Sequence, residues 1–243
     1  MNNKIDKPSL SLLKEKYKGK DYEDIIERIV VDNYPVQYAI GNVPFYGAII
    51  NVDERALIPR FETELLVDIV YKKIKGKKLN ILDLCTGSGC IAISLKNKSK
   101  DFNITGVDIS EKALSLAKEN AKLNNTEVEF IKKDILKDHK YKKKYDVIIS
   151  NPPYVKLSEY VSPNTKYEPQ NALYAGSNNL IFYETIIDYA KDILNDKFII
   201  AFEINNKDGR VLKELAEEKF ENAKVSLLKD YNKLDRFLII ENE

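Results

Sequence analysis

The sequence predicts an α/β fold with a doubly wound, mostly parallel sheet of seven strands. Short apolar runs alternate with amphipathic stretches over most of the 243 residues, a pattern typical of parallel strands joined by helices. A glycine turn, Gly87-Ser88-Gly89, follows one of these runs and opens a helical stretch. The last two runs, at 224–228 and 235–240, are close in sequence, so we expect them to form an antiparallel hairpin.

Two smaller units precede the sheet. Apolar residues of 1–33 are spaced as two short amphipathic helices that separate near Gly19, which predicts a helical N-terminal segment. Residues 34–60 are rich in Tyr, Pro and Gly and contain a strand-like run at 48–52, so we expect a linking hairpin there. The remaining residues, 61–243, form the sheet domain.

The sheet domain alternates strands with helices. It opens with a helix whose apolar stripe runs from Leu65 to Ile74. Ser110 begins another helix as an N-cap residue, with Glu111 close to the positive end of that helix. We expect strands near 79–84, 103–108, 128–134, 146–150, 197–203, 224–228 and 235–240, and two later helices near 180–194 and 208–219.

Polar side chains stand at the ends of four consecutive expected strands. These residues are Asp83, Asp108, Asp134 and Asn151. Because the carboxyl ends of parallel strands lie along one edge of a sheet, where open α/β folds bind their ligands, we expect all four to line one crevice. A single aspartate at such a place is as often a helix cap or a turn residue, but four in succession favour a binding site.

The glycine turn is compatible with two classes of cofactor. The run from Gly87 to Ala92 satisfies the dinucleotide pattern G-x-G-x-x-G/A, and Asp108 lies 21 residues after Gly87, near the spacing of roughly 20 for an acid that binds ribose. A carboxylate at Asp83, just before the turn, would repel a pyrophosphate but would suit the ammonium group of a methionine-type cofactor. The turn alone leaves both a nicotinamide or flavin cofactor and a methionine-type cofactor open.

The segment Asn151-Pro152-Pro153-Tyr154 directly follows the apolar run 146–150. Proline has no N–H and a fixed φ, so the strand stops here and leaves backbone carbonyl oxygens free. The Asn151 amide, the Pro152 carbonyl and the Tyr154 ring can together hold a planar NH2 group, because two oxygens accept its hydrogens and the ring packs on its plane. Asn-Pro and Pro-Pro are also ordinary turn dipeptides, so the context decides between a turn and a site.

The composition excludes several kinds of protein. Thirty-nine basic and 38 acidic residues give a net charge of +1, which supplies no argument for a nucleic-acid partner. With one histidine, His139, and two cysteines, Cys85 and Cys90, we expect no metal site and no Ser/His/Asp or Cys/His nucleophile. No run approaches 18 apolar residues and no signal-type region follows Met1, so we expect a cytoplasmic protein without membrane contact.

In these motifs the sequence resembles the class I S-adenosylmethionine-dependent methyltransferases, and in particular the HemK-type enzymes that methylate the glutamine of the Gly-Gly-Gln loop in peptide chain release factors. The Asn-Pro-Pro-Tyr motif is shared with adenine-N6 and guanine-N2 methyltransferases, whereas Ile58-Pro59-Arg60 is the more specific mark. The resemblance runs from about residue 35 to the end of the chain. The matching segments are 35–41, 45–47, 57–64, the glycine turn, 151–154, 168–169 and 202–204.

The resemblance implies a Rossmann-like fold, S-adenosylmethionine as the cofactor and release factors as the protein substrate, with a short N-terminal segment that docks the substrate. It implies that Asn151, Pro152, Pro153 and Tyr154 carry the catalysis. It also implies that Asp108 binds the ribose hydroxyls and that Asp134, with Ile135, binds the adenine. The residues assigned to the cofactor are Asp83, Cys85, Thr86, Gly87, Ser88, Gly89, Asp108, Asp134, Ile135 and Asn151.

Two other functions stay open at this point. One is a methyltransferase for another NH2 group, in a ribosomal protein or a nucleic-acid base, and the other is a non-catalytic S-adenosylmethionine-binding module. The chain also departs from the family pattern, with Phe61 in place of a proline, Cys85 in place of a glycine, and Asn205 and Asp208 where a glycine and a glutamine are usual.

Overall fold

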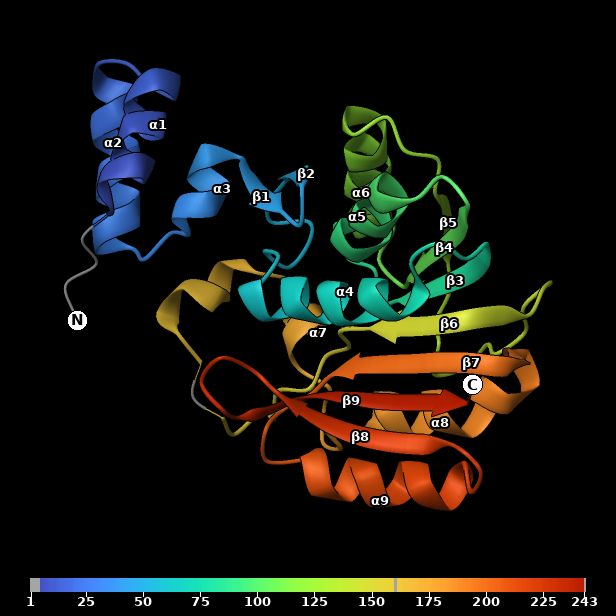
Figure 1. Cartoon of the computed structure of the whole chain (residues 1–243). Helices are drawn as coiled ribbons and strands as arrows, with labels where there is room; N and C mark the ends of the chain where they lie inside the picture. The colour runs from blue at the N-terminus through green and yellow to red at the C-terminus, as the bar shows by residue number, and fades with distance from the viewer. Residues whose placement is uncertain (1–4, 160, 243) are drawn as a thin grey trace.

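A computed structural model describes residues 5–159 and 161–242, in which a seven-stranded sheet carries helices on both faces (Figure 1). The strands of this sheet are β3 (Leu79–Leu84), β4 (Phe102–Asp108), β5 (Glu129–Lys132), β6 (Tyr145–Ser150), β7 (Leu194–Glu203), β8 (Lys224–Lys229) and β9 (Asp235–Asn242). Their order is β5-β4-β3-β6-β7-β9-β8. The strands from β5 to β7 run parallel, and β9 pairs antiparallel with both β7 and β8, which confirms the predicted fold class.

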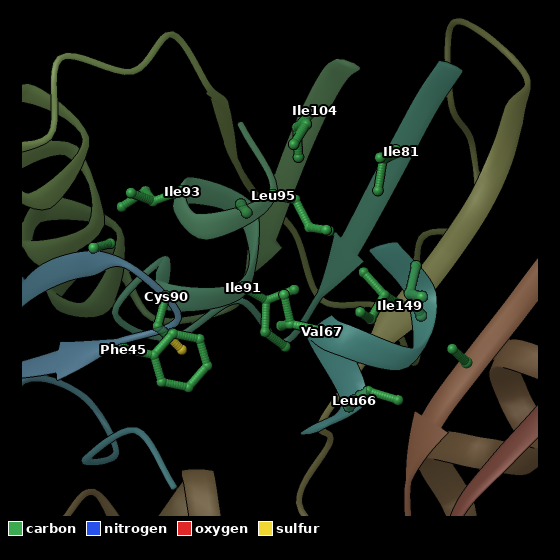
Figure 2. Close-up of a cluster of buried hydrophobic side chains, with 14 of the residues drawn as sticks. Phe45, Leu66, Val67, Ile81, Cys90, Ile91, Ile93, Leu95, Ile104 and Ile149 are labelled. Atoms are coloured by element: carbon green, nitrogen blue, oxygen red, sulfur yellow. The ribbon is translucent and has the colours of Figure 1, made fainter. Parts of the chain in front are cut away.

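Helices cover both faces of the sheet because the central strands are buried on both sides. In β3, Ile81 packs into the core on one face and the next residue, Leu82, packs into the core on the other. Figure 2 shows the first core, where side chains of the helices meet those of the strands. The helices on this first face are α4 (Phe61–Ile74), α5 (Cys90–Lys98) and α6 (Glu111–Leu123), and those on the second are α8 (Ile181–Ile193) and α9 (Gly209–Lys219).

Two of the expected strands differ from the prediction by three residues in length, and the others by two or fewer. The third, expected at 128–134, is the shorter β5, so Asp134 lies two residues beyond its end. The fifth begins three residues earlier than expected, at Leu194. Between β6 and α8 the chain forms a 3-10 turn, η1 (Pro163–Tyr167), and a short helix, α7 (Gln170–Leu173).

The N-terminal segment has a small hydrophobic core of its own. Its helices α1 (Lys7–Lys16) and α2 (Lys20–Val31) separate at Gly19, as expected, and Gly19 has a φ of +52°. The buried members of the core are Leu13, Ile25, Ile29 and Ala39. Ala39 comes from the linking segment, and Tyr34 packs against both this core and the first core of the sheet domain.

The linking hairpin is present as β1 (Asn42–Phe45) and β2 (Ala48–Asn51), which pair antiparallel. The helix before it, α3 (Val36–Ile40), was not expected, because five residues are too few to show a helical period. Residues 1–4 of the predicted segment 1–33 lie outside the described residues, as do residues 160 and 243 of the predicted sheet domain. Among the described helices, none is long and apolar enough to cross a membrane.

Candidate active site

A cavity of about 350 Å³ opens at the edge of the sheet where β5, β4, β3 and β6 end. Its volume lies within the range of small-molecule sites. The predicted site residues that line it are Cys85, Gly87, Asp108, Asp134, Ile135, Asn151 and Pro153. Three of the four polar residues expected at the strand ends, Asp108, Asp134 and Asn151, thus line one cavity. The predicted residues that do not line it, within the described part of the chain, are Asp83, Thr86, Ser88, Gly89, Pro152 and Tyr154.

Asp83 differs from the expectation that it lines the crevice. Its side chain is fully buried beneath the glycine turn, where one carboxylate oxygen accepts hydrogen bonds from the Thr86 hydroxyl and from the Ala92 N–H at 3.2 Å. Burial raises the pKa of this carboxyl to about 7, against the lowering effect of those two hydrogen bonds. Asp83 therefore stabilises the glycine turn from its buried side. It does not line the cavity, so it would affect a ligand only by holding the turn in place.

Asp108 joins the glycine turn to the start of α6. Its carboxylate accepts one hydrogen bond from the Gly87 N–H at 2.9 Å and one from the Ser110 N–H at 2.8 Å. Burial raises the pKa of Asp108, while these backbone donors act in the opposite direction. Each oxygen keeps a second lone pair, so the carboxylate can also accept from the hydroxyl groups of a bound ribose.

The two glycines of the turn serve different purposes. Gly87 has a φ of +55° and lines the cavity, and a Cβ there would meet no atom closer than 4.0 Å, so a ligand can approach its backbone. Gly89 has a φ of +80°, and a Cβ there would lie 3.1 Å from the Cβ of Ala117 in α6. We conclude that Gly89 is required for helix packing, whereas Gly87 leaves the cavity open.

The far end of the cavity combines an acid with an apolar surface. Asp134 accepts a hydrogen bond from the Leu136 N–H at 3.1 Å, and Ile135 beside it is buried in the cavity wall. Lys137 forms an ion pair with the Asp134 carboxylate at 3.1 Å, and Lys133, which lines the cavity, is paired with Asp138 at 2.8 Å. This end therefore offers hydrogen-bond acceptors and a flat apolar contact, which suit an adenine ring and its amino group.

Residues 53–60 form a strap that contributes Arg55, Ala56 and Leu57 to the cavity wall. Glu168, which is buried, accepts a hydrogen bond from the Ile58 N–H at 3.0 Å and forms an ion pair with Arg60. Arg55, which lines the cavity, is itself paired with Glu119 of α6 at 2.7 Å. The strap is thus fastened both to the connection that contains α7 and to α6.

The Asn151-to-Tyr154 segment is held by residues that sequence reasoning did not assign to the site. The Asn151 side-chain N–H donates to the Thr63 hydroxyl at 3.0 Å, and the Tyr154 hydroxyl donates to Glu203 at 3.2 Å. The Thr63 hydroxyl in turn donates to Glu203 at 2.7 Å. The signal in the sequence is slight: Thr63 is a polar residue on the buried face of α4, and Glu203 ends an apolar strand.

The three residues singled out in the composition lie in different places. Cys85 lines the cavity with a φ of +59°, and Cys90 packs in the first core of the sheet. His139 stacks on the ring of Tyr189, with the ring centres 4.4 Å apart, and does not line the cavity.

Comparison with known proteins assigns the chain to a family. Residues 61–209 match the family model of the methyltransferase small domain. The release factor glutamine methyltransferase of Lactococcus lactis is 38% identical over 237 residues, which cover 96% of this chain and 87% of that protein. The enzyme of the same name from Streptococcus pneumoniae is 39% identical over 223 residues, covering 90% of this chain and 79% of that protein.

A solved structure agrees with the fold. The crystal structure of a methyltransferase from Pyrococcus furiosus superposes with a TM-score of 0.60 at 19% identity, covering 90% of this chain and 94% of that one. Fold, site and family model together define an S-adenosylmethionine-dependent methyltransferase, so the predicted cofactor class is confirmed and the nicotinamide or flavin alternative is set aside. Within that class, the chain belongs to the release factor glutamine methyltransferase family.

The residues of the cavity fit this cofactor. The Asp108 carboxylate has lone pairs free to accept from hydroxyl groups, and no cationic side chain lies within ion-pair distance of it among the described residues. Arg55 and Lys133, the two cations on the wall, are each paired with an acid. The cavity wall therefore has a carboxylate without a cationic partner, whereas each of its cations is neutralised by an acid. This balance of charge favours a positively charged ligand over a pyrophosphate.

Proposed function

We propose that this protein transfers a methyl group from S-adenosylmethionine to the side-chain amide nitrogen of the glutamine in the Gly-Gly-Gln loop of peptide chain release factors. The relatives that support this substrate share 38% to 39% identity with the chain over most of their length. The observation that carries the proposal is Asn151, an amide in the cavity wall whose NH2 group is bound to Thr63. We place the reaction in the cytoplasm, where translation terminates.

The acceptor needs careful positioning because an amide nitrogen is a poor nucleophile. Its lone pair is delocalised into the carbonyl group, the same resonance that keeps a peptide bond planar. S-adenosylmethionine, when bound, supplies an electrophilic methyl group on a sulfonium. The protein therefore has to orient the nitrogen towards the methyl group, and good alignment can contribute roughly 7–11 kcal/mol.

Asn151 and Pro152 supply the acceptors for this orientation. The Asn151 side-chain oxygen has no donor among the described residues, since its NH2 group takes the contact with Thr63. That oxygen and the Pro152 carbonyl would each accept one hydrogen of the substrate NH2 group, which favours localisation of the lone pair on nitrogen. Pro153 shapes the turn, and the ring of Tyr154 packs on the amide plane. The nitrogen loses its proton during or after transfer.

A methyl-transfer assay tests the proposal. Purified protein is incubated with S-adenosylmethionine that carries a deuterated methyl group and with a bacterial release factor, and the peptides are read by mass spectrometry. We expect one added methyl group on the glutamine of the Gly-Gly-Gln loop. A release factor in which this glutamine is replaced by alanine is the control, and labelling that persists on it would overturn the proposed acceptor.

The same assay distinguishes the other acceptors. A ribosomal protein fraction and a DNA duplex are offered under identical conditions, since both contain NH2 groups. We expect neither to be labelled at a rate comparable to that of the release factor. Faster labelling of either one would assign the site to that substrate instead.

A further inference from the structure

Glu203 is a buried carboxylate at the carboxyl end of β7, beside the segment that follows β6. It is 1% exposed, and no cationic side chain lies within ion-pair distance of it among the described residues. Burial raises its pKa, and Arg236 of β9 and Glu62 of α4 act on it from a distance in opposite directions. Burying a carboxylate without a cation costs desolvation free energy, and the hydrogen bonds that Glu203 accepts have to offset this cost.

Both oxygens of Glu203 accept hydrogen bonds from hydroxyl groups next to the site. One accepts from Thr63 at 2.7 Å, and the other accepts from Tyr154 at 3.2 Å. A threonine hydroxyl has a single hydrogen, and here that hydrogen goes to the carboxylate. The Thr63 oxygen can therefore only accept from its other neighbour, Asn151, at 3.0 Å.

These hydrogen bonds determine which end of the Asn151 amide faces Thr63. The NH2 end must point to Thr63, because only that end can donate, and the oxygen end is left for the substrate. The reversed amide would set an oxygen against the lone pairs of Thr63 and would present an NH2 group to the NH2 group of the substrate. Two donors facing each other cannot form the hydrogen bond on which the alignment depends.

Resting on the proposed function, we propose that Glu203 is a positioning residue, which acts through Thr63 to orient the Asn151 amide oxygen towards the substrate nitrogen and through the Tyr154 hydroxyl to hold the aromatic ring. The same carboxylate thereby sets both ends of the four-residue segment. Neither Thr63 nor Glu203 lines the cavity, so both act without touching the cofactor.

A matched pair of substitutions at Thr63 tests the orientation. Thr63→Val keeps the shape of the side chain but removes the hydroxyl, and Thr63→Ser keeps the hydroxyl but removes the methyl group. We expect Thr63→Val to lower kcat at least tenfold and Thr63→Ser to stay within about threefold of the wild type. The Kd for S-adenosylmethionine should stay within about twofold in both. Equal kcat values in the two variants would overturn the proposal.

Glu203→Gln tests the carboxylate itself. Glutamine has nearly the same size but can offer only one acceptor end, so it cannot serve both the Thr63 and the Tyr154 hydroxyls. We expect kcat to fall at least tenfold with an unchanged Kd for S-adenosylmethionine. A wild-type kcat in this variant would show that the two hydroxyl contacts have no part in positioning.

A measurement without substrate separates this inference from the proposed function. The side-chain NH2 resonances of Asn151 are assigned in the 1H–15N NMR spectrum by their loss in Asn151→Asp. We expect them to coincide in the wild type and Thr63→Ser and to move in Thr63→Val. If the wild type fails to label release factors while this contrast holds, the substrate is wrong and the orienting network stands. If release factors are labelled and the three spectra coincide, the network is wrong and the substrate stands.

Discussion

The two halves of the cavity wall depend on contacts between residues that are separated by very different numbers of residues in the sequence. In the cofactor half, Gly87 donates to Asp108, which is 21 residues away. In the acceptor half, Asn151 contacts Thr63, 88 residues away, and Thr63 contacts Glu203, 140 residues away. One strand-turn-helix unit with its neighbouring strand builds the first half, whereas the second forms only when three distant segments meet. We expect substitutions in the first half to change cofactor affinity and those in the second to change turnover.

The largest expected effect is that of Asn151→Ala in the acceptor half. Loss of a preorganised acceptor typically costs ~3 kcal/mol in the transition state, so methyl transfer should fall by roughly a hundredfold or more. The Kd for S-adenosylmethionine, measured by calorimetry, should stay within about tenfold. Asn222→Ala, at an exposed asparagine between α9 and β8, is the matched control. A rate close to that of the wild type in Asn151→Ala would refute the division into two halves.

Asp108→Ala should show the opposite behaviour in the cofactor half. Hydrogen bonds to a charged group are worth about 1.5–3 kcal/mol, so the Kd for S-adenosylmethionine should rise by one to two orders of magnitude. Turnover at saturating cofactor should fall less, because ribose binding contributes equally to ground state and transition state. Asp101→Ala, at the exposed opposite end of β4, is the control. An unchanged Kd for Asp108→Ala would show that this residue acts only as a turn and cap residue.

Substitutions of Gly87 and Gly89 separate an effect on stability from an effect on cofactor affinity within the cofactor half. In Gly89→Ala the new Cβ would crowd Ile93 at 3.0 Å and Ala117 at 3.1 Å, so the free energy of unfolding should fall by roughly 1–3 kcal/mol. In Gly87→Ala the new Cβ makes only an ordinary contact, with the Cys85 carbonyl oxygen at 4.0 Å, so the positive φ is the main cost to stability, about 1 kcal/mol. Gly87→Ala should instead weaken cofactor binding more than Gly89→Ala does. Denaturant unfolding and calorimetry on both variants decide, and a reversed order of the two affinities would contradict the assignment.

The last prediction from a substitution concerns the pH dependence of stability at the buried Asp83, apart from either half's function. Because its pKa is raised to about 7, the folded state binds more protons than the unfolded state between the ordinary aspartate pKa and 7. This carboxyl therefore contributes stability at low pH that is lost as the pH rises through that window, at about 1.4 kcal/mol per pH unit. Asp83→Asn should remove this contribution to the slope between pH 5 and 6 in denaturant unfolding. An identical slope in wild type and variant would show that Asp83 titrates normally.

The same difference in sequence separation explains which site residues could be predicted from the sequence. Asp108 and Asn151 were predictable because each stands at the carboxyl end of an apolar strand, and parallel strands end at one edge. Asp83 follows the same rule but lies beneath the turn, because its carboxylate satisfies the Thr86 hydroxyl and the Ala92 N–H. Thr63 could not be placed at the site, because nothing local in α4 shows that its third residue meets a loop 88 residues away.

The separate core of the N-terminal segment has a consequence for local unfolding. Because its buried residues form a cluster distinct from the two cores of the sheet domain, this segment can open while the sheet stays folded. We expect its amide hydrogens to exchange with solvent at a lower opening free energy than those of β3 or β6. The segment is nevertheless linked to the connection after β6, since the Tyr167 hydroxyl donates to the Asp32 carbonyl at 3.3 Å and the Tyr34 ring lies edge-on to that of Tyr167. Opening of the N-terminal core would release one support of the chain segment that contributes Pro169, Asn171 and Ala172 to the cavity wall, so amide exchange in residues 163–173 should rise with it.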